Sequence, residues 1–307
     1  MVNQRMWSDL EIVAMPDMTN RESGYWRCGR FKLSLEKPLV MGILNVTPDS
    51  FSDGGRFFER DAAVVQALKM VSQGADIIDV GGESTRPGAA AVSVEDELSR
   101  VIPVIETLAE RVQVPISIDT RHADVASNAV RAGASVINNI MPLTEDTGMA
   151  RVVAESGAGL VVMHMRGTPL SMNSLTVYED VVTEVFAELK AGMELAVANG
   201  VSTRQIVVDP GIGFAKELTH NLELLARLDN FRELAPVMVG TSRKRFIGEL
   251  CCVHDSSDRT GGSLGAVVWC ALHGASVLRV HDVKESWQAL SVVDALLKIR
   301  RNRDVYA

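Results

Sequence analysis

Residues 115–139 read PISIDTRHADVASNAVRAGASVINN, and this stretch contains the repeating unit that decides the fold. A short apolar run ends at Asp119, apolar residues at helical spacing follow up to Gly133, and a second short run ends at Asn138. Both runs are rich in β-branched residues and continuous, as is typical of parallel strands buried on two faces. The stretch therefore predicts a strand, a helix and a second, parallel strand.

The same unit recurs along the whole chain. The short apolar runs are Leu39–Leu44, Ile77–Val80, Pro115–Ile118, Ser135–Ile137, Gly159–Met163, Ile206–Val208, Pro236–Val239 and Ser276–Val280. The stretches with helical spacing are Asp61–Gly74, Val94–Arg111, His122–Gly133, Gly148–Gly157, Val177–Gly200, Thr219–Leu228, Gly262–Gly274 and Trp287–Arg301. Strands that alternate with helices in this number predict an α/β fold of the (β/α)8 TIM barrel type, with an open doubly wound sheet as the alternative.

The segment before the first barrel strand has a different pattern. Two short runs flank Gly29 within Tyr25–Leu35 and predict a β-hairpin. We expect this hairpin to plug the N-terminal face of the barrel. Residues 1–22 show no clear period and are expected to form a mobile extension, so a single barrel domain would span residues 23–307.

Composition narrows the class of protein. The chain has 307 residues with 31 Lys and Arg against 39 Asp and Glu, a net charge of −8, which argues against nucleic acid as a partner. We find no apolar run long enough to span a bilayer and no signal peptide. The four cysteines lack C-x-x-C spacing, and the six histidines lack metal-ligand spacing. These features predict a cytoplasmic protein with no membrane partner and no zinc.

Polar groups follow each predicted strand, at the barrel face where active sites lie. Asp119, Asn138 and Asp209 end three strands and can bind a flat heterocycle with an amino-amide edge. The cations near the mouth are Arg86, Lys244, Arg279 and His281. Arginine and lysine in this part of a barrel suit phosphate groups. The residues alone therefore predict a small ligand with a polar ring at one end and a phosphate at the other.

Each of these residues also has a structural interpretation. Asp119 could cap the next helix, and Asp209 before Pro210 could serve a turn. Asn138 could be satisfied by backbone groups, and residues 242–245 could be a solvated run of charge. His164, on an apolar strand, is better explained as a satisfied core histidine. Residues 49–55 and 81–88 combine glycines with polar tips, as loops that close over a site do.

Several long motifs resemble the dihydropteroate synthase family. They are residues 41–55 (MGILNVTPDSFSDGG), 79–89 (DVGGESTRPGA), 117–120 (SIDT), 209–214 (DPGIGF), 242–244 (SRK) and 279–283 (RVHDV). They stand in the family's order and cover about residues 25–300. The resemblance implies a barrel that joins 6-hydroxymethyl-7,8-dihydropterin diphosphate to 4-aminobenzoate, giving 7,8-dihydropteroate and diphosphate in folate biosynthesis.

The resemblance also implies roles for individual residues. It places the pterin against Asp119, Asn138, Asp209, Lys244 and Arg279. It places the diphosphate against Asn45, Arg86, Arg279 and His281, with Asn45 as a ligand of Mg²⁺. It places 4-aminobenzoate against Phe51, Thr85, Pro87, Phe214 and Ser242. The catalytic residues would be Asp53, Asp119, Asp209 and Lys244. A homodimer, SN1-like loss of diphosphate and inhibition by sulfonamides are further implications.

Three positions depart from the family pattern: Asn139 stands where Asp is common, Arg166 where Gln is common, and Arg245 where a small residue is common. Of these, Asn139 bears on the site, since it could change the orientation of Asn138. Two other functions remain as alternatives, a pterin-dependent methyltransferase and a non-catalytic pterin-binding paralogue. The residues 84–88 and 242–244 favour the synthase over the methyltransferase.

Overall fold

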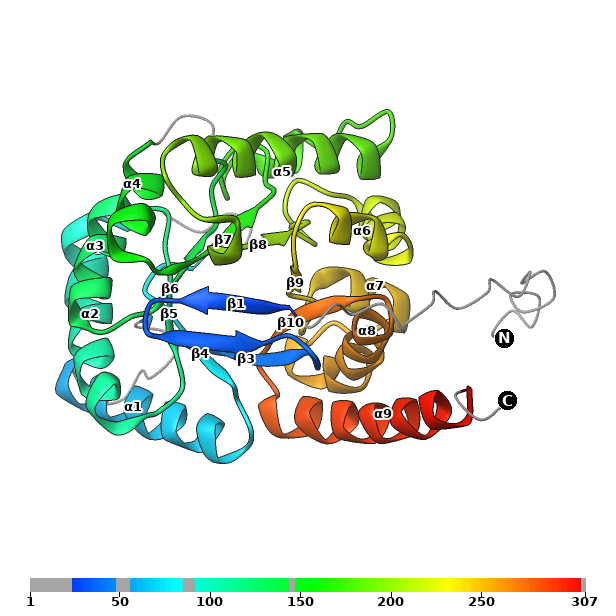
Figure 1. Cartoon of the computed structure of the whole chain (residues 1–307), viewed down its shortest axis with the longest axis horizontal. Helices are drawn as coiled ribbons and strands as arrows, with labels where there is room; N and C mark the ends of the chain where they lie inside the picture. Colours follow the sequence, from blue (N-terminus) through cyan, green and yellow to red (C-terminus); the bar gives the residue numbers. More distant parts are fainter. Residues whose placement is uncertain (1–23, 48–55, 85–91, 144–146, 305–307) are drawn as a thin grey trace.

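The computed structural model describes residues 24–47, 56–84, 92–143 and 147–304. Parallel strands close into a barrel in which each strand pairs with the next along the chain and β10 returns to β3 (Figure 1). The barrel strands are β3 (Leu39–Asn45), β4 (Ile77–Gly81), β5 (Ile116–Asp119), β6 (Val136–Asn139), β7 (Gly159–Met163), β8 (Ile206–Asp209), β9 (Val237–Val239) and β10 (Ala275–Val280). The predicted (β/α)8 barrel is confirmed, and the open sheet is wrong.

Helices surround the barrel on its outside (Figure 1). They are α1 (Arg56–Ser72), α2 (Val94–Arg111), α3 (Ala123–Ala132), α4 (Thr147–Ser156), α5 (Val181–Ala198), α6 (Leu218–Ala226), α7 (Arg245–Cys251), α8 (Thr260–Leu272) and α9 (Val283–Asp304). Short 3-10 turns are η3 (Met172–Ser174), η4 (Thr203–Gln205), η5 (Leu228–Glu233) and η6 (Ser256–Arg259). Every predicted helical stretch contains a helix. The pattern missed α7, whose seven residues are too few to show a clear period.

Helix α2 shows how local sequence sets these elements. Ser93 ends the preceding turn, and its Oγ accepts a hydrogen bond from the backbone N of Asp96 at 3.1 Å. This N-cap satisfies one of the backbone donors that a helix start leaves open. Val101, Ile105 and Leu108 then recur at helical spacing and are fully buried in the layer between helices and barrel. Burial of this face fixes the helix on the outside of β4 and β5.

The predicted hairpin is present as β1 (Tyr25–Cys28) and β2 (Phe31–Ser34), which pair antiparallel around Gly29. Trp26 is fully buried, and its Nε1 donates to the backbone O of Gln205, just before β8, at 2.7 Å. The backbone N of Gly29 donates to the O of Gly157, just before β7, at 2.9 Å. Both contacts lie at the N-terminal ends of strands. The hairpin therefore plugs that face of the barrel, as predicted.

Side-chain alternation along the strands places the polar groups. Trp26 packs in one cluster with Ile77, Val136, Val207 and Val277, each from a different strand, so these positions point into the barrel. Two residues further along each strand, the same inward direction recurs. Those positions are Asp79, Asn138, Asp209 and Arg279. The plug thus fills one end of the barrel, and an inward layer of polar side chains lies above it.

Among the described residues, no helix has the length and apolar character to cross a membrane.

Candidate active site

Arg279, from β10, joins two acidic side chains across the barrel. Its Nε lies 2.6 Å from Oδ2 of Asp79, and its Nη2 lies 2.5 Å from Oδ2 of Asp119. Asn138 Nδ2 donates to the same Oδ2 of Asp79 at 3.2 Å. Residues from β4, β5, β6 and β10 therefore form one connected polar layer. The structure brings together three of the predicted site residues and adds Asp79, which the sequence analysis missed.

Asp79 is fully buried, yet its side chain is a carboxyl group in the middle of an apolar strand. A carboxylate within an otherwise apolar run is costly to bury unless it has partners. That mismatch was the available signal in the sequence, since the run Ile77–Val80 contains it. Asp79 supplies the oxygen that orients both Arg279 and Asn138.

Several buried side-chain oxygens on the barrel strands or just after them have no hydrogen-bond partner among the described residues. They are Oδ1 of Asp79, Asp119 and Asn138, with Oγ of Ser117 and Oγ1 of Thr241. Buried acceptors are normally satisfied, and each one left unpaired costs free energy. A flat ligand that offers several N–H donors would satisfy them. The layer is therefore chemically suited to the amino-amide edge of a heterocycle.

Burial shapes the ionisation of the two acidic residues at the strand ends. It raises the pKa of Asp119 to about 7, although the charge of Arg279 acts in the opposite direction. It also raises the pKa of Asp209, against the opposing charge of Lys244 and a hydrogen bond from the backbone N of Gly211. For Arg279, burial disfavours the charge, but Asp79 and Asp119 raise its pKa above the usual value. The guanidinium thus stays charged.

Lys244 lies beside Asp209 and Phe214. Burial lowers the pKa of the Lys244 ammonium to about 8. Its Nζ donates to the backbone O of Ile212 and stands 4.6 Å from the centre of the Phe214 ring. A cation over an aromatic face is an attractive contact. Lys244 and Phe214 therefore form one wall of the site, and this wall adjoins the polar layer at Asp209.

The structure describes only part of the predicted diphosphate end of the site. His281 Nδ1 lies 3.0 Å from Oγ of Ser242, which also accepts the backbone N–H of His281 at 3.2 Å. Ser242 therefore contacts both the backbone and the ring of His281. Asn45 ends β3, where it is in register with Gly81 of β4. The predicted site residues Phe51, Asp53, Thr85, Arg86 and Pro87 lie outside the described ranges.

The departures from the family pattern leave this layer intact. Asn139 Nδ2 donates to the backbone O of Met141 at 2.5 Å, so it braces the turn after β6. Asn138 takes its orientation from Asp79 instead. Arg245 forms an exposed ion pair with Glu249, one turn along α7. Neither residue replaces a group in the polar layer.

One group of described side chains has the spacing of a cation site. Ligand atoms of Glu83, Glu97 and His122 lie within 4.8 Å of one another. Arg121 already binds Glu83 through Nε at 2.9 Å, and His122 Nδ1 lies 2.7 Å from Oε2 of Glu97. The two carboxylates therefore have cationic or hydrogen-bonding partners within the protein.

Fold and site together define a (β/α)8 barrel with a buried layer of polar and charged side chains inside it, and the comparisons identify its family. The family model described as "Pterin binding enzyme" matches residues 41–281. Dihydropteroate synthase of Escherichia coli K12 is 49% identical over 275 residues, which is 88% of this chain and 96% of that protein. The chain belongs to the dihydropteroate synthase family of pterin-binding enzymes.

Solved structures extend the likeness to three dimensions. Xanthomonas albilineans dihydropteroate synthase with 4-aminobenzoic acid is 44% identical, with a TM-score of 0.85 over 90% of this chain and 99% of that one. The same protein in complex with 7,8-dihydropteroate is 42% identical, with a TM-score of 0.81 over 89% of this chain and 98% of that one. The sequence-based assignment to this family is confirmed.

Proposed function

We propose that the protein joins 6-hydroxymethyl-7,8-dihydropterin diphosphate to 4-aminobenzoate and releases diphosphate, forming 7,8-dihydropteroate. One observation carries this proposal: buried, unpaired oxygens of Asp79, Asp119 and Asn138 lie beside the charged Arg279. A pterin ring presents N–H donors at one edge and would satisfy these acceptors. The related structures with 4-aminobenzoic acid and with 7,8-dihydropteroate support the same two substrates.

Binding would use the two faces of the site differently. Asp119 and Asn138 would accept N–H groups of the pterin, and Asp209 with Lys244 would hold its other edge. Ser242 and Phe214 would line the space for 4-aminobenzoate. Arg279 and His281 would face the diphosphate, where a guanidinium suits phosphate oxygens. From the sequence alone, we add Arg86 to the diphosphate end, and Thr85 and Pro87 to the 4-aminobenzoate end.

The reaction we propose breaks the bond between the methylene carbon and the diphosphate oxygen first. The remaining cation is conjugated with the electron-rich dihydropterin, and the carboxylates of Asp209 and Asp119 stabilise its positive charge. The amine nitrogen of 4-aminobenzoate then bonds to the methylene carbon and loses one proton. That amine is neutral near pH 7, so no strong base is required. Phe51 and Asp53, which follow β3 in the sequence, would help to exclude water.

A magnesium ion fits the donor set at the diphosphate end. Asn45, at the half-buried end of β3, offers an amide oxygen, the hard ligand type that Mg²⁺ accepts. When bound, Mg²⁺ would neutralise charge on the diphosphate oxygens. We therefore keep Asn45 as the proposed protein ligand.

We also propose a homodimer and a cytoplasmic location. Helix α9 supports the dimer, because it exposes a series of large apolar side chains. They are Trp287, Val292, Leu296 and Ile299. Exposed apolar patches of this kind mark contact surfaces. Light scattering on the purified protein gives the mass directly, and a monomer at assay concentration would contradict the dimer.

The deciding experiment measures diphosphate and dihydropteroate together. Purified protein receives dihydropterin diphosphate and Mg²⁺, with and without 4-aminobenzoate. We expect release that depends on 4-aminobenzoate and matches dihydropteroate one for one. D209N provides the inactive control. Pterin binding without release would favour the non-catalytic paralogue, and transfer of a methyl group would favour the methyltransferase.

A further inference from the structure

Lys216 is a buried lysine that the proposed reaction does not use. It lies just before α6 and is 5% exposed. Its Nζ donates to the backbone O of Phe214 at 2.9 Å and to Nδ1 of His164 at 2.9 Å. No described carboxylate forms a direct ion pair with it. A buried ammonium held by neutral acceptors is an expensive arrangement that needs explanation.

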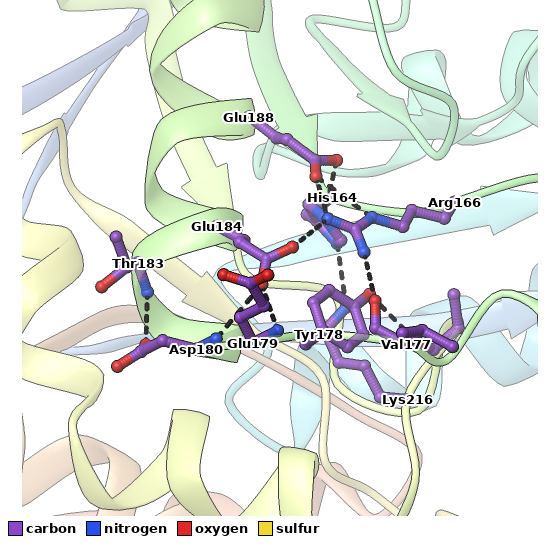
Figure 2. Close-up of polar contacts among 11 residues, drawn as sticks. His164, Arg166, Val177, Tyr178, Glu179, Asp180, Thr183, Glu184, Glu188 and Lys216 are labelled. Atoms are coloured by element: carbon purple, nitrogen blue, oxygen red, sulfur yellow. Dashed lines mark hydrogen bonds and ion pairs between the residues drawn. The ribbon is translucent and has the colours of Figure 1, made fainter.

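His164 holds Lys216 from the neighbouring strand end. Its side chain is almost fully buried, and its Nε2 lies 3.0 Å from Oε2 of Glu188 on α5 (Figure 2). Burial lowers the pKa of Lys216 to about 7, and in its ammonium form this group can only donate, so Nδ1 of His164 then accepts from it. The ring proton therefore sits on Nε2 and faces Glu188. Burial and the charge of Lys216 lower the pKa of His164 to about 4, which keeps the ring in this neutral form.

Arg166 anchors the outer end of the same chain of contacts. Its guanidinium pairs with Glu188 and with Glu184, the latter at 2.9 Å (Figure 2). It also lies 4.1 Å from the centre of the Tyr178 ring. Helix α5 is thereby tied to the loop after β7, and that loop is tied through His164 to Lys216.

A second contact joins the loop after β7 to the loop after β8. The hydroxyl of Tyr178 donates to the backbone O of Ala215 at 3.0 Å. Ala215 has a φ of 50°, a left-handed conformation that a residue with a Cβ adopts only when its surroundings hold it there. Phe214 precedes it and carries the carbonyl that Lys216 binds. Two independent hydrogen bonds thus fix consecutive residues of the loop after β8.

That loop builds the wall we assign to 4-aminobenzoate. Lys244 stands over the Phe214 ring and donates to Ile212, so the position of Phe214 depends on the loop backbone. Lys216 binds the Phe214 carbonyl directly, whereas Asp209 is linked to the loop only at Gly211, whose backbone N donates to Oδ1 of Asp209 at 2.7 Å. The charged groups around Lys216 are Asp209, Lys244, Glu188 and Arg166. Removal of Lys216 would therefore disturb Phe214 before it disturbs the pterin residues.

We propose that Lys216 is a positioning residue for the amine substrate, acting through the Phe214 carbonyl and held in place by His164 and Glu188. This inference rests on the proposed function. It names no contact between Lys216 and substrate, since the effect passes through the wall that Phe214 forms.

The test compares Michaelis constants for both substrates in K216M. We expect the KM for 4-aminobenzoate to rise about tenfold while the KM for dihydropterin diphosphate changes less than about threefold. Y178F, which removes only the hydroxyl on Ala215, should raise the same KM about threefold. K190M is the matched control, because Lys190 is exposed on α5 and pairs only loosely with Glu194. It should behave as the unsubstituted protein does.

Each kinetic outcome for these variants either supports or overturns the role of Lys216. A purely structural role would reduce the number of active molecules, so kcat would fall with both KM values unchanged; that result in K216M overturns the inference. If K216M fails to fold, Y178F decides, and an unchanged KM for 4-aminobenzoate overturns it. The unsubstituted protein is assayed in parallel. Absence of its turnover overturns the proposed function itself, whereas normal turnover with unaltered KM values in the variants overturns this inference alone.

Discussion

Arg279 and Asp79 stand 200 positions apart in the chain, yet Nε of one lies 2.6 Å from Oδ2 of the other inside the barrel. Asp79 also orients Asn138, so a single carboxylate aligns a charged donor and an amide on two other strands. Both contacts should weaken when a neutral group replaces that carboxylate, which gives the first prediction.

D79N should impair catalysis more than it impairs folding of the barrel. The amide cannot accept as strongly from Arg279, which keeps only Asp119 as a charged partner. We expect kcat/KM for the pterin substrate to fall about 30-fold, equivalent to ~2 kcal/mol. Steady-state kinetics measure this change. D258N alters an exposed aspartate and should have no effect; equal activity of D79N and D258N would contradict the role of Asp79.

The pH dependence of kcat/KM should be bell-shaped. Asp119 has a pKa raised to about 7, so it becomes ionised, and able to stabilise the cation, as pH rises through that value. Lys244 has a pKa lowered to about 8, so its charge is lost as pH rises further. The value of kcat/KM for the pterin substrate should therefore rise as pH passes about 7, be highest between about 7 and 8, and fall as pH passes about 8. In D119N the residual activity should lack the rising limb, and persistence of that limb would assign it to another group.

G211A should be far more damaging than G157A. Both glycines have left-handed φ angles, 68° for Gly211 and 71° for Gly157, so alanine is strained at either position. A Cβ on Gly157 meets nothing nearby, whereas one on Gly211 would fall inside the backbone O of His164. We expect G157A to cost about 1 kcal/mol and G211A about 3 kcal/mol or more. Urea denaturation measures both, and similar losses would show that the close approach to His164 is unimportant.

W26A should lower stability and leave the KM values unchanged. Trp26 is fully buried in the plug, and its loss should cost about 3–5 kcal/mol of the free energy of unfolding. W269A removes a tryptophan that is 44% exposed on α8 and should cost much less. Thermal melts rank the two. A change in either KM for W26A would mean that the closed end of the barrel influences the open end.

Sulfonamides should inhibit the protein in competition with 4-aminobenzoate. They share its aryl amine, and the proposed pocket at Phe214 and Ser242 would accept either ring. Initial rates at several concentrations of both compounds test this. An inhibition constant far above the KM for 4-aminobenzoate, or inhibition that 4-aminobenzoate does not relieve, would contradict it.

The fold was predictable because its signals are local. Buried parallel strands and amphipathic helices each leave their own period in the sequence, and Asp119, Asn138 and Asp209 mark where strands end. Strand ends meet at one face of a barrel, so their convergence followed from the fold class. The hairpin was equally clear, since Gly29 separates two short runs.

Contacts between distant residues were not predictable in this way. Asp79 was counted with its apolar strand, because only the closed barrel brings Arg279 to it. Lys216 lies two residues after Phe214 in the loop after β8, and nothing nearby in the sequence shows that His164 lies against it. Helix α7 was missed for a different reason, its short length. The assignments of Phe51, Asp53, Thr85, Arg86 and Pro87 stay predictions.

The pairing of β10 with β3 has a consequence for how the protein is made. Strand β3 leaves the ribosome early with one edge unpaired, and that edge finds its neighbour only after Val280 has been synthesised. The same last strand delivers Arg279 to Asp79 and Asp119. A nascent or truncated chain that stops before Ala275 therefore lacks both a closed barrel and its central cation. The barrel therefore closes, and the polar layer gains Arg279, in the same late step.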